Sequence, residues 1–173
     1  MIQLRSVEIA LGGVFTALAL AIPLLFRGTL QFVIPEIGYS ATLASHVPVM
    51  LSIVAGPSVA ALVGFASTFG FLLTLGPVVA ARAATHILFG VTAAVAVKRG
   101  LSYPKALFLV ALPLHSIPEG LVVIPFGIPP WGALINMVGG TIHHTIDSII
   151  SIIILRSAQP LIRNLRLPTA SKA

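Results

Sequence analysis

The chain contains no cysteine, and only 8% of its residues are charged. The lack of cysteine excludes disulfides and thiolate metal sites, and it leaves the redox compartment open. Few charges, together with 57% hydrophobic residues and a mean hydropathy of +1.08, are typical of a protein that lies largely in a lipid bilayer. A Walker A sequence is also absent, so any ATP hydrolysis linked to this protein takes place on another chain.

Short breaks that contain Gly, Pro, Lys or Arg separate the apolar runs, and the length accommodates one domain with about six helices. The runs predict membrane helices over residues 7–26, 47–55, 58–75, 78–97, 104–124 and 131–155. The second helix is short, and the mostly apolar segment 28–44 before it is expected to form a long loop. The expected fold is therefore all-α, with six transmembrane helices in one domain, 1–173, and a flexible tail over about 157–173.

The net charge of +6 is distributed unevenly along the chain. No basic face accompanies aromatic stacking residues, which argues against nucleic acid as a partner. With six crossings, Arg27 alone falls in a loop on one side of the membrane. The basic residues on the other side are Arg5, Lys98, Arg99, Lys105, Arg156, Arg163, Arg166 and Lys172. Because cytoplasmic loops contain the excess of Lys and Arg, both termini are predicted to be cytoplasmic and the 28–44 loop to face outward.

A few polar and charged residues lie within or beside the apolar runs, where an unpaired charge costs about 2.5–3.5 kcal/mol on insertion scales. Arg82 and His86 are four residues apart and share one face of their helix. A guanidinium at this depth suits a planar carboxylate, which it can bind through two hydrogen bonds. His46 is expected to open the second helix from the outside. We expect an outward-facing pocket for a small molecule, with contacts from Arg82, His86, His46, Glu119, Asn136 and His143.

The polar residues also allow other interpretations. Arg82 and Glu119 can neutralise each other without any ligand, and each histidine can be a hydrogen-bonding residue between helices. His143, His144 and Asp147 form an HHxxD sequence, so a membrane-embedded metal-dependent enzyme is the alternative of a different class. No glutamate adjoins the histidines as in HExxH, and Asp147 is expected well below the outer cluster. A clasp between Asp147 and a neighbouring histidine is therefore favoured, and no metal is expected.

Small side chains recur every four residues on the first helix, at Gly13, Ala17 and Ala21. In a membrane, such a ladder of small residues allows a second helix to approach closely. That second helix can belong to this chain or to another protein, and the spacing by itself favours neither.

Several stretches resemble a known family. The first is Ala17-x-x-x-Ala21, and the second is Ser45-His46-Val47-Pro48-Val49-Met50, followed by Gly56-Pro57. With the small size, the six predicted helices and the long outer loop, they resemble the substrate-binding S component of an energy-coupling factor (ECF) transporter over nearly the whole chain. The closest similarity is to the niacin-specific group, through Arg82-Ala83-Ala84-Thr85-His86 and Gly140-Thr141-Ile142-His143-His144-Thr145-Ile146-Asp147-Ser148.

This resemblance implies a non-enzymatic protein that binds a vitamin, niacin first and another water-soluble vitamin or precursor as the alternative. It implies a multi-pass protein of a prokaryotic cell membrane, with a pocket near the outer face that the first outer loop caps. The implied partners are membrane lipid, a transmembrane T component and two cytoplasmic ATPase subunits. The face formed by Gly13, Ala17 and Ala21 would meet the T component. ATP and Mg²⁺ would be used by the partners, and this chain would contain no cofactor.

Overall fold

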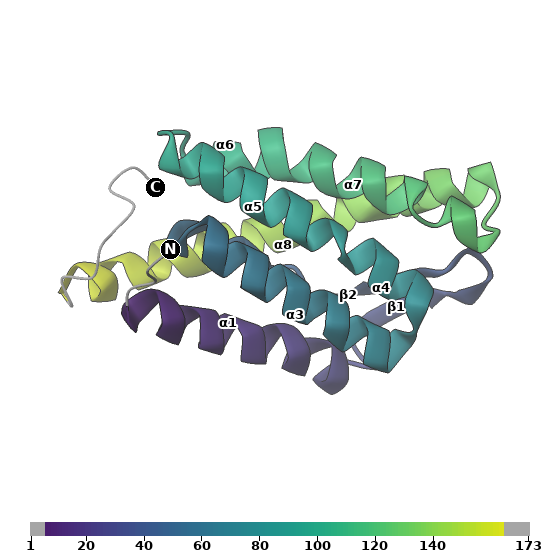
Figure 1. The fold of residues 1–173 in the computed structure, drawn as a ribbon, viewed down its shortest axis with the longest axis horizontal. Helices are drawn as coiled ribbons and strands as arrows, with labels where there is room; N and C mark the ends of the chain where they lie inside the picture. Colours follow the sequence, from purple (N-terminus) through teal and green to yellow (C-terminus); the bar gives the residue numbers. More distant parts are fainter. Residues whose placement is uncertain (1–5, 165–173) are drawn as a thin grey trace.

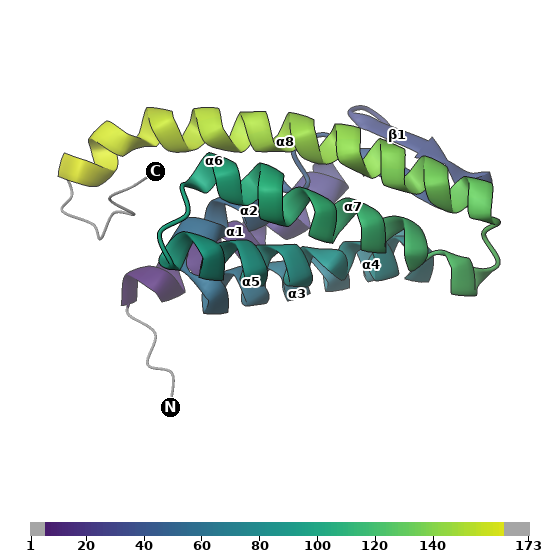
Figure 2. The same cartoon turned by 90° about the horizontal axis from the view of Figure 1, so that it is seen from above.

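The computed structural model describes residues 6–164, with side chains as far as residue 160. Within that range the protein is an elongated bundle of helices with a short β-hairpin near one end (Figure 1). A view from above shows the helices running lengthwise beside one another (Figure 2). Four of the basic residues in the charge count have no described side chain, namely Arg5, Arg163, Arg166 and Lys172.

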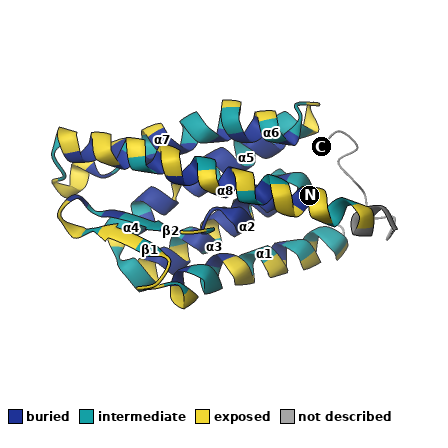
Figure 3. Ribbon diagram, turned by 180° about the vertical axis from the view of Figure 1, so that it is seen from behind, coloured by how far each residue is buried: buried dark blue, intermediate teal, exposed yellow. Residues whose placement is uncertain are grey.

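Five segments of the described chain are long and apolar enough to cross a membrane. They are α1 (Ser6–Leu25); α3 (Pro57–Leu75); α4 with α5 (Pro77–Ala83, Thr85–Lys98); α6, η3, α7 and η4 (Tyr103–Lys105, Ala106–Ala111, Leu112–Leu121, Ile124–Phe126); and α8 (Pro130–Asn164). These five segments confirm five of the predicted helices, although α8 continues through Asn164 rather than ending at residue 155. Many large apolar side chains are exposed on their outer surfaces (Figure 3), as expected where lipid surrounds the bundle.

The second predicted helix, over residues 47–55, is much shorter than a membrane crossing. It consists of α2 (Val47–Ser52) and the 3-10 turn η2 (Ile53–Ala55). The expected loop before it contains an antiparallel hairpin of β1 (Gln31–Ile34) and β2 (Tyr39–Thr42), joined by the 3-10 turn η1 (Pro35–Ile37). The described chain therefore has five long helices and one short one, where the sequence predicted six transmembrane helices, the second of them short, and no strand.

Close contacts at glycines show how α1 and α3 run relative to each other. A Cβ on Gly12 would lie 3.5 Å from Val59, and one on Gly70 would touch Leu20. The earlier part of each helix thus packs against the earlier part of the other, so the two helices are parallel. The hairpin, α2 and η2 between them consequently return the chain from one end of the bundle to the other. The predicted second helix is present within this connection as α2 and η2.

The later helices alternate in direction. Gly64 lies so close to α5 that its Cβ would be 2.9 Å from the backbone nitrogen of Ile87, and Gly90 faces Ala60, so α3 and α5 are antiparallel. Short connections make the remaining helices antiparallel too, which places the start of α1 and the end of α8 at the same end (Figure 1). The basic residues with described side chains at that end are Lys98, Arg99, Lys105 and Arg156.

Two irregular helix segments position polar groups in the interior. Between α4 and α5, the Thr85 hydroxyl donates to the carbonyl of Arg82 at 2.7 Å. Farther along, η3 is a π-helical segment just before Pro113, which has no backbone N–H to donate. The Leu107 carbonyl in η3 accepts a hydrogen bond from Nε2 of His144 at 3.3 Å. The first segment thus lies between Arg82 and His86, and the second offers a backbone carbonyl to His144 in α8.

Candidate functional site

A small polar cavity lies inside the half of the bundle that the hairpin covers, and we call it the chamber. Its volume is about 20 Å³, which is room for one water molecule. Side chains from the hairpin and from nearly every long helix contribute to its wall. The lining residues are Ser40, Thr42, Ser45, His46, Phe71, Val79, Arg82, Ala83, His86, Glu119 and His143.

Arg82 ties the hairpin to α7. Its Nη1 donates to the carbonyl of Gly38 at 3.0 Å, and its Nη2 donates to the carbonyl of Ser40 at 3.2 Å. Nη2 also donates to Oε1 of Glu119 at 2.5 Å, and the guanidinium carbon lies 4.9 Å from the centre of the Tyr39 ring. Burial and, to a lesser extent, the Glu119 carboxylate raise the pKa of Tyr39, so its phenol stays neutral beneath the guanidinium. Arg82 and Glu119 therefore neutralise each other in this structure, as the alternative interpretation of the sequence proposed.

The same ion pair retains two polar atoms without a hydrogen-bond partner among the described residues. Nε of Arg82 is an open donor, and Oε2 of Glu119 is an open acceptor. The nearest ring nitrogen to that oxygen is Nε2 of His115 at 3.8 Å, which is too far for a hydrogen bond. Leaving a buried polar atom unpaired costs about 1–3 kcal/mol. The pair can therefore donate one further hydrogen bond and accept another, either from water or from a ligand.

The hairpin rests on one face of α8, where small side chains allow close approach. A Cβ on Gly139 would come within 2.6 Å of the Tyr39 ring, and one on Gly132 within 2.9 Å of Ile37. Between these two glycines, Nδ2 of Asn136 donates to the carbonyl of Ile37 at 3.0 Å. The hairpin therefore packs against a face of α8 formed by Gly132, Asn136 and Gly139.

Asp147 holds the end of the hairpin segment inside the bundle. Its Oδ1 accepts the backbone N–H of Ala44 at 2.9 Å, and its Oδ2 accepts that of His46 at 3.0 Å. Nδ1 of His46 and Nε2 of His143 lie 3.0 and 3.2 Å from Oδ2. A clasp between Asp147 and histidine is present. Asp147 lies about two turns of α8 beyond Gly140, which faces Glu119, so it is deeper than the Arg82–Glu119 pair, as predicted. It still contacts His46, because segment 43–46 descends into the bundle to meet it.

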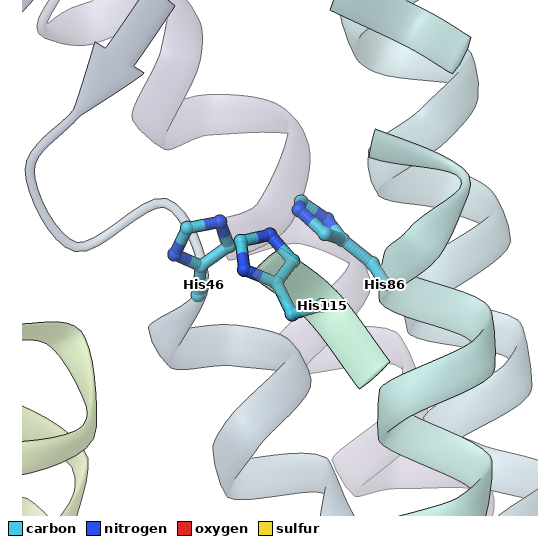
Figure 4. Close-up of side chains that lie close together, drawn as sticks. All are labelled: His46, His86 and His115. Atoms are coloured by element: carbon cyan, nitrogen blue, oxygen red, sulfur yellow. The ribbon is translucent and has the colours of Figure 1, made fainter. Parts of the chain in front are cut away.

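The other four histidines of the chain gather around His46. The ring centroids of His143, His115 and His86 lie 4.3, 4.4 and 4.8 Å from that of His46, and His144 lies at 6.0 Å. Each of these side chains is buried. His46 does open the second helix, as predicted, but it packs against His86 and His115 from the middle of the long helices rather than at the outer end of the bundle. Figure 4 shows three of these rings, from three separate segments, close together.

Comparisons with protein-family models, with curated proteins and with solved structures return no match for this chain. The functional interpretation therefore depends on the geometry of the chamber and on the resemblance noted in the sequence.

The structure brings five of the six predicted contact residues to the chamber wall: Arg82, His86, His46, Glu119 and His143. The sixth, Asn136, donates instead to the carbonyls of Ile37 and Gly132 and supports the hairpin. The sequence analysis missed Ser67, whose hydroxyl lies 2.9 Å from Nδ1 of His86. The sequence feature that could have identified Ser67 is its position as a polar residue in the middle of an apolar run. It also missed the hairpin residues that contact Arg82, because their role depends on the fold.

The HHxxD alternative is not assembled as a single metal site among the described residues. Two groups of side chains have ligand atoms within 4.8 Å of one another: His46, His86 and His115; and His46, His143 and Asp147. Neither group contains His144, whose Nε2 faces the Leu107 carbonyl.

A second hollow lies between the hairpin and α8 and differs in character from the chamber. Its volume is about 420 Å³, and its wall is almost wholly apolar. The lining residues are Phe32, Ile34, Tyr39, Leu134, Ile135, Val138, Gly139 and Ile142. Lipid tails suit this surface better than a polar ligand does, so the chamber is the candidate site.

The small-residue ladder of α1 faces partly outward. Gly13 and Ala17 are exposed, and nothing in the described chain lies within 4 Å of a Cβ placed on Gly13. Gly12 and Ala19 face the bundle instead, while Ala21 is half-buried. Packing within the described chain therefore does not account for the small residues at Gly13 and Ala17.

Proposed function

We propose that this chain is the substrate-binding S component of an ECF-type vitamin importer and that its ligand is niacin, as nicotinate or nicotinamide. The observation that best supports this proposal is the open donor on Arg82 beside the open acceptor on Glu119, both inside a helical membrane protein. A carboxamide can satisfy both atoms, and a carboxylate can accept from the guanidinium. Histidines in the same wall offer partners for the ring nitrogen.

Binding of niacin requires the hairpin to move. The chamber has room for about one water molecule and none for an aromatic ring. The carbonyls of Gly38 and Ser40 occupy two N–H groups of Arg82. A ligand with its own acceptor oxygens can replace these carbonyls when the hairpin lifts from α8. In this proposal, the hairpin is the lid of the site.

The proposal includes a T component and two ATPase subunits as partners, since this chain has no Walker A sequence. ATP and Mg²⁺ are then used by those subunits. The outward small-residue face of α1 is the docking face for the T component. In a prokaryotic cell membrane, six crossings result if the hairpin and α2 together count as the second crossing. Both termini are then cytoplasmic.

Arg82→Ala is expected to weaken niacin binding by about 10–100-fold, because a hydrogen bond to a charged group contributes roughly 1.5–3 kcal/mol. Arg82→Lys should also bind poorly, since an ammonium does not reproduce the planar guanidinium fork. Calorimetry on purified protein in nanodiscs, with nicotinate and with nicotinamide, measures the affinities of both variants. The matched control is Arg27→Ala, which removes an exposed arginine and should leave the affinity unchanged.

An unchanged affinity in folded Arg82→Ala protein would leave Arg82 as a structural partner of Glu119 alone. A panel of other water-soluble vitamins tests the ligand separately. Binding of a different vitamin would replace niacin and retain the S-component proposal.

The orientation in the membrane is tested with single cysteines, since the natural chain has none. Thr29 and Ser102 lie at opposite ends of the bundle, and the basic residues gather at the end of Ser102. An impermeant maleimide added to intact cells is expected to label Thr29→Cys and not Ser102→Cys. Labelling of Ser102→Cys and not of Thr29→Cys would show that the protein has the opposite orientation.

A further inference from the structure

We propose that His46, His86 and His115 bind one divalent transition-metal ion of the kind that prefers imidazole, with Zn²⁺ and Co²⁺ as probes. One ring nitrogen of each residue lies within 4.8 Å of the other two, and Figure 4 shows the three rings close together. Nitrogens at about 2.0–2.1 Å from a tetrahedral Zn²⁺ are about 3.3 Å apart. Modest side-chain rotations therefore complete the site. This inference goes beyond the niacin proposal and does not depend on it.

His115 gives the strongest indication of a missing partner. It is 0% exposed, and neither ring nitrogen has a hydrogen-bond partner in the part of the chain that the structure describes. A neutral imidazole has one donor and one acceptor, and buried polar groups are rarely left unpaired. A metal ion on one nitrogen satisfies the lone pair. The other nitrogen can then donate to the open Oε2 of Glu119, which lies 3.8 Å from Nε2.

The other two histidines lie beside groups that can orient metal ligands. Nδ1 of His86 lies 2.9 Å from the hydroxyl of Ser67. Nδ1 of His46 lies 3.0 Å from Oδ2 of Asp147 but is not aligned for a hydrogen bond, which a small rotation of the ring would complete. When Nδ1 is turned toward such a partner, Nε2 is the nitrogen that remains for a metal. Asp147 is itself fixed by two backbone N–H groups, so the pair is held in place.

The charges in and next to the chamber also favour a cation. The described charged side chains there are Arg82, Glu119 and Asp147, one cation against two anions. Arg82 pairs with Glu119, which leaves the charge of Asp147 beside His46 and His143. Burial disfavours a protonated imidazole. A divalent ion on neutral imidazoles neutralises the charge of the buried carboxylate without adding a proton and leaves one net positive charge, which an anionic fourth ligand can offset.

The second group of potential ligands, His46, His143 and Asp147, suits a metal less well. Both carboxylate oxygens of Asp147 already accept backbone hydrogen bonds, and Nε2 of His143 lies 2.9 Å from the carbonyl of Thr42. The first group adjoins the chamber through His46 and His86, and the chamber has room for one water molecule. Three histidines and an exchangeable fourth ligand form a common arrangement for Zn²⁺.

The test uses the full chain in nanodiscs, purified without a histidine tag and stripped with a chelator. Zn²⁺ binding is measured by calorimetry, and Co²⁺ binding by its visible absorption. We expect one ion per chain and the spectrum of four-coordinate Co²⁺. His86→Ala and His115→Ala should each weaken binding by about 100-fold or more, and Asp147→Asn by about 10–100-fold. The matched control is His144→Asn, a buried histidine outside both groups, which should bind as the unaltered chain does.

The unaltered chain provides a second measurement that needs no variant to fold. An ion that binds only the folded protein raises its unfolding temperature, so Zn²⁺ should raise it and excess chelator should reverse the effect. Absence of stoichiometric binding and of this shift would overturn the proposal. Loss of binding in His143→Asn but not in His115→Ala would assign the ion to the other group and overturn the assignment. Niacin is absent throughout, so the two proposals fail independently.

Discussion

Asp147→Ala is expected to destabilise the folded protein by about 2–6 kcal/mol, because it leaves two buried backbone N–H groups unpaired at roughly 1–3 kcal/mol each. Asp147 is 0% exposed and accepts two backbone hydrogen bonds, from Ala44 and His46. Alanine leaves both N–H groups without an acceptor inside the bundle, where water does not replace it. The free energy of unfolding, from a denaturant titration in detergent micelles, measures the effect.

Ser148→Ala is the matched control for Asp147→Ala. Ser148 is the next residue in α8 and is equally buried, but its hydroxyl contacts the Met50 sulfur at 3.9 Å, which is a weak interaction. Its loss should cost less than about 1 kcal/mol. Limited proteolysis should also cleave the hairpin of Asp147→Ala faster than that of the control. Equal stability of the two variants would show that Asp147 does not anchor the hairpin.

Ala17→Trp is expected to reduce ATP-driven uptake to background while changing niacin binding less than about twofold, if the proposed function is correct. Ala17 is exposed on α1, and Trp there prevents a neighbouring helix from approaching closely. The chamber is formed by other segments of the chain. Binding is measured on the isolated protein. Assembly is measured by recovery of the T component with the tagged chain, and transport by uptake of labelled niacin.

Leu73→Trp is the matched control. It introduces the same tryptophan side chain at a residue of α3 that is 71% exposed. It should assemble and transport normally. If Ala17→Trp also assembles and transports, the ladder of small residues does not dock a partner. Where Ala17→Trp does not fold, Ala21→Trp tests the same face.

The positions of the long helices could be predicted from the sequence because their cause is local. Apolar runs of about 20 residues match the thickness of a bilayer, and Gly56-Pro57 and Gly76-Pro77 mark the starts of two helices. The buried polar residues were also identifiable, since a polar side chain in an apolar run needs a partner wherever the fold places it. That Arg82 and Glu119 might pair was foreseeable for the same reason.

The hairpin and the depth of His46 could not be predicted in the same way. Strands β1 and β2 have only four residues each, and they are stabilised by contacts with α8 and Arg82 rather than by a pattern of their own. Ala44 adopts a φ of 65°, which is unusual for a residue with a side chain, while its N–H bonds to Asp147. The partner that stabilises this turn is 103 residues away in the sequence.

The sequence by itself determined that the chain is a helical membrane protein with a polar interior, because hydrophobic length and the cost of buried charge depend on residue type alone. Only the tertiary structure decided which polar groups meet. Helical spacing shows that two side chains share a face, but the register between helices depends on close contacts such as Gly64 against Ile87. These contacts bring His46, His86 and His115 together and leave the nitrogens of His115 unpaired among the described residues.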